Sequence, residues 1–84
     1  LSERHMAVTL DTPITAGLAV IGDEILSGRT KDRNISTIAD HLTAIGIALK
    51  EVRVVPDEED LIVEAVNALR HRYTYVFTTG GIGP

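Results

Sequence analysis

A glycine-rich stretch at the end of the chain has residue types suited to binding a phosphate. It reads Thr78-Thr79-Gly80-Gly81-Ile82-Gly83-Pro84 and directly follows an apolar segment. Glycine tolerates positive φ angles and close approach to a ligand, so its N–H groups can point at phosphate oxygens without Cβ atoms in the way. The pattern predicts a phosphate-binding loop at Gly80, Gly81 and Gly83, and the alternative is a plain strand-to-helix turn.

Two acidic corners are the second candidate for chemistry. Asp23 and Glu24 follow the apolar run AGLAVI and Gly22, whereas Asp57 follows Val-Val-Pro. Carboxylates that share one rim repel one another, and a Mg²⁺-type ion that bridges to substrate phosphates would relieve the repulsion. We therefore expect Asp23, Glu24 and Asp57 to be metal ligands. The alternatives are a solvated turn for the first two and a helix cap for Asp57.

The remaining polar residues are weaker candidates. Asn34 is suited both to capping a helix and to reaching the site. His41 lies beside an apolar helical stripe and His71 lies in a basic stretch, so both are expected at the surface. Ser27 and Thr30 have no base nearby in the sequence and no nucleophile motif, which argues against covalent catalysis.

Composition limits the class of protein. The chain has 84 residues, 44% of them apolar and 24% charged, as expected for one folded domain or part of one. The net charge of −4 leaves no basic patch, so neither nucleic acid nor an anionic membrane is an expected partner. The absence of cysteine excludes disulfides and thiolate chemistry and fits a cytoplasmic protein.

The two ends of the chain indicate which residues belong to the domain. Residues 1–6 (LSERHM) resemble the remnant of a cleaved expression tag, which leaves residues 7–84 as the domain. No apolar run approaches the roughly 20 residues of a spanning helix. A glycine loop of this kind normally opens a helix, so we expect residues 7–84 to be the amino-terminal part of a longer domain.

Strands and helices that would position these residues alternate along the chain. The apolar run at 16–21 predicts a strand buried on both faces. Apolar residues at helical spacing predict a helix from Asn34 to Gly46, with Asp32, Asn34 or Ser36 as its cap. Alternation of apolar and polar residues predicts a strand at 47–55, which Pro56 ends.

A second helix and a third strand complete the pattern. Asp57, Glu58 and Glu59 place negative charge where a helix begins, and residues 70–72 (RHR) place positive charge where it ends. Tyr75–Thr78 is rich in strand-forming residues and leads into the glycine stretch. Two consecutive βαβ units predict an α/β fold with a parallel sheet in the order 2-1-3. All three corners then lie at one rim, at the switch point between strands 1 and 3.

Four of these motifs, taken together, resemble a known family. The motifs are GDEILSG at 22–28, Asp32-x-Asn34, VVPD at 54–57 and TGGIGP at 79–84. In order and spacing they are similar to the molybdopterin-binding domain shared by MoaB, MogA and the amino-terminal part of CinA. They also resemble the amino-terminal domain of FAD synthases. The residues of the first and third motifs favour the CinA and FAD-synthase branches of the family.

The resemblance implies a three-layer α/β/α domain with a mostly parallel sheet. In that family the GGIGP block continues into a Thr-x-x-Asp-Asp segment and a helix that complete the phosphate site. The cofactor-binding positions that it implies here are Gly22, Asp23, Glu24, Asp32, Asn34, Gly80, Gly81 and Gly83. It also implies a homo-oligomer.

Two functional classes and a third alternative follow from the resemblance. In the first, the domain binds molybdopterin or a nucleotide phosphate in molybdenum-cofactor handling, with adenylyl transfer as the related reaction. In the second, it is a metal-dependent pyrophosphatase of the CinA kind, acting on an ADP-ribose-type nucleotide, with Asp23 and Asp57 as the catalytic residues. In the third, it is a non-catalytic assembly module.

Overall fold

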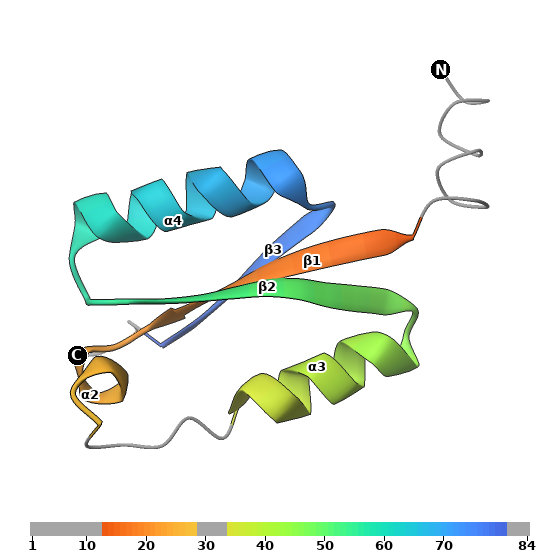
Figure 1. Ribbon diagram of the computed structural model, residues 1–84, viewed down its shortest axis with the longest axis horizontal. Helices are drawn as coiled ribbons and strands as arrows, with labels where there is room; N and C mark the ends of the chain where they lie inside the picture. The colour runs from red at the N-terminus through yellow and green to blue at the C-terminus, as the bar shows by residue number, and fades with distance from the viewer. Residues whose placement is uncertain (1–12, 29–33, 81–84) are drawn as a thin grey trace.

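The computed structural model describes residues 13–28 and 34–80, which form a three-stranded sheet covered by helices (Figure 1). The strands are all parallel, in the order β2-β1-β3, as predicted. The helix α4 lies over one face of the sheet and α3 lies over the other (Figure 1). The elements are β1 (Ile14–Ile21), α2 (Asp23–Leu26), α3 (Asn34–Ala44), β2 (Ile47–Val55), α4 (Glu59–Arg72) and β3 (Tyr75–Gly80).

The central strand β1 carries most of the core. Its residues Ala16–Ile21 are buried because neighbouring strands pair with both of its edges and helices cover its faces. Leu18 of β1 and Leu69 of α4 are both fully buried. Each contributes about 1.5–3 kcal/mol to folding. The continuous apolar run therefore marks the middle of the sheet, as predicted for a parallel strand.

The helix α4 approaches β1 at a glycine. A Cβ atom added to Gly17 would lie 2.8 Å from Cδ2 of Leu69 and 3.0 Å from Cδ2 of Tyr73. The side chains of Leu69 and Tyr73 would therefore have to shift to make room for any larger residue at position 17. Among the described residues, no helix has both the length and the hydropathy needed to cross a membrane.

The strand β2 contains a bulge at Lys50. Leu49 pairs with Ala16, whereas the next pair along β1 is Gly17 with Glu51, so Lys50 has no partner in the register. One extra residue shifts the alternation by one position. This explains why the alternating apolar residues change from odd positions at Ile47 and Leu49 to even positions at Val52 and Val54.

Three boundaries differ from the sequence prediction. The first strand starts at Ile14 rather than at residue 16, and the third continues to Gly80 rather than ending at Thr78. The expected turn after β1 is the one-turn helix α2, in which the N–H of Ser27 donates to the carbonyl of Asp23 over 2.9 Å. The alternative interpretation of Asp57 as a helix cap is wrong, because α4 begins at Glu59 and the extended residue before it, Glu58, occupies the cap position.

A polar cluster fastens the end of α4 to β2. The carboxylate of Glu51 accepts hydrogen bonds from the hydroxyl of Tyr73 over 2.7 Å, from Nε of Arg53 over 2.8 Å and from Nη1 of Arg72 over 3.1 Å. These donors stabilise the charged carboxylate, Tyr73 most strongly, and lower the pKa of Glu51 from 4.5 to about 2. The cluster therefore ties the α4–β3 connection to the edge strand.

Candidate functional site

The three strand ends meet at one edge of the sheet. Ile21 pairs with Val55 on one side and with Gly80 on the other. Beyond the last pair, the N–H of Gly22 donates to the carbonyl of Val55 over 3.0 Å. This confirms the predicted convergence of the strand ends, whereas the binding roles of their residues stay predictions.

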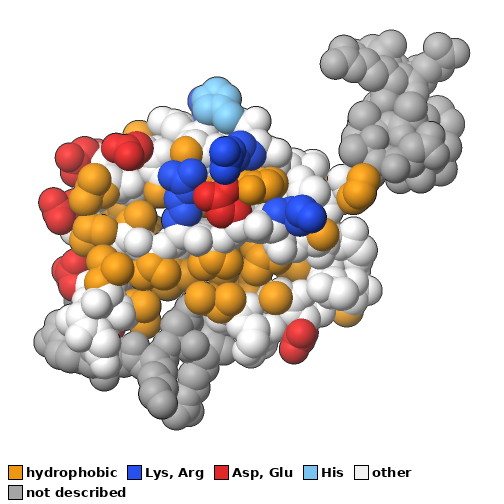
Figure 2. All heavy atoms as spheres, viewed as in Figure 1, with side chains coloured by type: hydrophobic (Ala, Val, Ile, Leu, Met, Phe, Trp, Pro, Cys, Tyr) orange, Lys and Arg blue, Asp and Glu red, His pale blue; other side chains and the backbone are white. Residues whose placement is uncertain are grey.

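A hydrogen bond joins the two acidic corners. The main-chain N–H of Asp57 donates to Oδ1 of Asp23 over 3.3 Å, and both residues are exposed. The two residues are 34 positions apart in the chain. Figure 2 shows acidic side chains gathered at the end of the molecule where α4 begins. The edge thus carries carboxylates that reach solvent.

The carboxylate of Glu24 lies back over the end of β1. A Cβ atom added to Gly22 would collide with Oε1 of Glu24 and would lie 3.0 Å from its Cδ. Gly22 itself has an extended backbone, with φ 164°. The absence of a side chain at Gly22 therefore leaves the space that the Glu24 carboxylate occupies.

Gly80 fixes the start of the glycine stretch against β1. Its φ is +80°, in the left-handed region that favours glycine. A Cβ atom added to Gly80 would collide with the carbonyl oxygen of Ile21. Both observations require glycine at the position where β3 ends beside the acidic corner.

The carboxylates at the strand-end edge only partly fit a metal ion. Within residues 13–28 and 34–80, no three His, Asp or Glu side chains lie close enough together to hold one. Asp23, Glu24 and Asp57 therefore do not form a three-carboxylate cluster. Mg²⁺ is commonly held by one or two carboxylates together with substrate phosphates. Asp23 and Asp57 fit that smaller role, and metal binding stays a prediction.

Several candidate residues cannot be placed in the site. Asp32, Gly81 and Gly83 lie outside the described residues. The helix α3 begins at Asn34, as predicted, but the side chain of Asn34 is likewise outside the description. His41 and His71 are exposed, which confirms their predicted surface positions.

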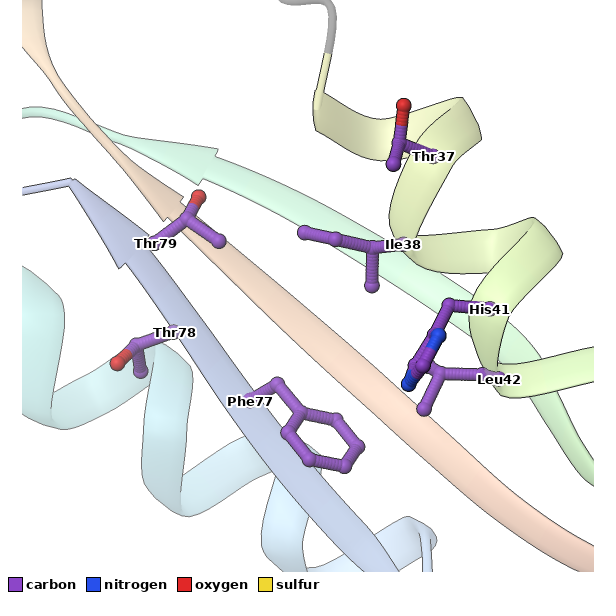
Figure 3. A pocket seen from close by; sticks show the side chains of 7 residues that line it. All are labelled: Thr37, Ile38, His41, Leu42, Phe77, Thr78 and Thr79. Carbon is purple, nitrogen blue, oxygen red and sulfur yellow. The ribbon is translucent and has the colours of Figure 1, made fainter. Parts of the chain in front are cut away.

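A groove that sequence reasoning missed lies between α3 and β3 (Figure 3). It encloses about 370 Å³ and is lined by Thr37, Ile38, His41, Leu42, Phe77, Thr78 and Thr79. Ile38, His41 and Leu42 point from the helix toward the sheet, and Phe77 points back at them (Figure 3). The available signal was the helical spacing of Ile38 and His41, which places His41 at the margin of the buried stripe.

A family model matches most of the chain. The model, described as a probable molybdopterin binding domain, matches residues 17–84. A probable FAD synthase from Caenorhabditis briggsae is 43% identical over 70 residues, which is 83% of this chain and 13% of that protein. A CinA-like protein from Amoebophilus asiaticus is 43% identical over 65 residues, which is 76% of this chain and 16% of that protein.

A solved structure shares the fold. The crystal structure of CinA, a protein of unknown function from Thermoplasma acidophilum, matches with a TM-score of 0.81 and 33% sequence identity. The match covers 86% of this chain and 43% of that one. The chain thus spans less than half of that structure and about one eighth of the FAD synthase it matches.

Proposed function

Because the chain belongs to the family of probable molybdopterin-binding domains, we propose that its strand-end edge binds the phosphate of molybdopterin or of a nucleotide. The observation that carries the proposal is the junction at Ile21, where one residue pairs with Val55 and with Gly80. This junction brings the acidic corners and the start of the glycine stretch to a switch point of a parallel sheet. Ligands of α/β proteins bind at such points.

The residues at the edge have complementary roles in this proposal. N–H groups of the glycine stretch from Gly80 to Gly83 donate to phosphate oxygens. Asp23 and Asp57 would hold a divalent cation beside the phosphate, and Glu24 would supply further negative charge there. The cation, when bound, would neutralise charge on the phosphate. Without it, the carboxylates repel the ligand, so binding should depend on Mg²⁺.

A second candidate is hydrolysis of a nucleotide pyrophosphate of the ADP-ribose type. The hydrogen bond from the main-chain N–H of Asp57 to Oδ1 of Asp23 favours it, because the bond holds two acidic residues at one edge, where they would suit the placement of a cation and a water molecule. The water would attack one phosphorus, the P–O–P bond would break, and two phosphate monoesters would form. Nucleotidyl transfer, in keeping with the FAD-synthase relatives, would use the same edge with a different acceptor. A non-catalytic assembly module is the remaining alternative.

A binding screen tests the proposal. Molybdopterin, ATP, FAD and ADP-ribose are titrated into the protein with and without Mg²⁺, and product formation from ADP-ribose is followed in parallel. Asp23→Asn and Asp57→Asn should each weaken Mg²⁺-dependent binding at least tenfold, whereas Asp40→Asn, on the exposed side of α3, should leave it unchanged. Tight binding without turnover supports the binding domain, and Mg²⁺-dependent cleavage supports the hydrolase. Equal binding by all variants contradicts both.

A further inference from the structure

We draw no further inference here: the strongest candidate, the apolar groove between α3 and β3, lies on an edge strand of the described sheet, and nothing in the structure shows what covers it.

Discussion

The main-chain N–H of Asp57 donates to Oδ1 of Asp23 over 3.3 Å, so the chain leaving β2 is held against the chain leaving β1. The pairing of β1 with β2 ends two residues earlier in each strand, at Ile21 and Val55. The hydrogen bond thus extends the contact between the two strands beyond the sheet itself. It also limits the distance between Asp23 and Asp57.

Asp23 should have separable effects on stability and on phosphate binding. Asp23→Asn retains an oxygen that can accept the N–H of Asp57 but removes the charge, whereas Asp23→Ala removes both. Because the bond is exposed, we expect Asp23→Ala to lower the free energy of unfolding by about 0.5–1 kcal/mol and Asp23→Asn to lower it by less. Urea denaturation measures these changes. Both variants should lose Mg²⁺-dependent binding, and full binding by Asp23→Asn would show that its charge is not needed.

Gly80→Ala should be among the costliest single changes at the edge. Alanine in the left-handed region costs about 1–2 kcal/mol, and here its Cβ atom would also collide with the carbonyl of Ile21. Gly46→Ala is the matched control, because Gly46 has φ +88° but has open space around it. Thermal or urea unfolding should show a larger loss for Gly80→Ala. Equal losses would mean that β3 ends farther from β1 than the structure places it.

The Glu51 cluster makes stability depend on acid pH. The pKa of Glu51 is about 2 in the folded protein and near 4.5 when its partners are absent, so the unfolded chain binds the proton more readily. The stabilisation is therefore complete above about pH 4.5 and is lost as the pH falls toward 2. Urea midpoints measured between pH 6 and pH 2 should show this loss.

Tyr73→Phe tests the cause of the Glu51 pKa shift. The Tyr73 hydroxyl is the largest contributor, so its removal should raise the folded-state pKa of Glu51 and reduce the fall in stability between pH 4.5 and 2. Glu51→Gln should remove that part of the pH dependence altogether. If stability falls with pH in Tyr73→Phe as it does in the unchanged protein, the arginines cause the lowered pKa of Glu51 instead.

Gly22→Ala should alter the site more than the fold. The extended backbone of Gly22 suits any residue, and the atom that blocks a Cβ there is the mobile end of Glu24. We expect a loss of less than about 1 kcal/mol in stability, with movement of the Glu24 carboxylate and weaker Mg²⁺-dependent phosphate binding. Glu24→Gln should reproduce the binding loss without the steric change. If only Gly22→Ala weakens binding, the charge of Glu24 is not needed for binding.

The order of strands and helices could be predicted because local patterns determine it. The apolar run of β1, the stripe of α3 and the change of charge sign along α4 each specify one element, and right-handed crossovers then set the strand order. The bulge at Lys50 was not predicted, because a shift in register depends on the pairing partner. The cap position of α4 could not be selected from the sequence for a similar reason. The sequence offers three adjacent acidic residues there, and packing selects among them.

The site could be predicted only where residues lie directly at strand ends. The location of Asp23, Asp57 and Gly80 at the edge could be predicted from their positions in the sequence, because parallel strands bring their carboxyl ends to one edge. The groove beside Phe77 depends on how α3 sits across the sheet. Helix placement of this kind is a tertiary property, and His41 was therefore assigned only to the surface.

The most direct test of the central claim is a titration of the ¹⁵N-labelled protein with inorganic pyrophosphate and Mg²⁺, followed by the amide shifts of every residue. The largest shifts should cluster at the strand-end edge, at Gly22, Asp23, Asp57 and Gly80. Shifts concentrated at the opposite end of the sheet, near Gly46 and Thr74, would contradict the account.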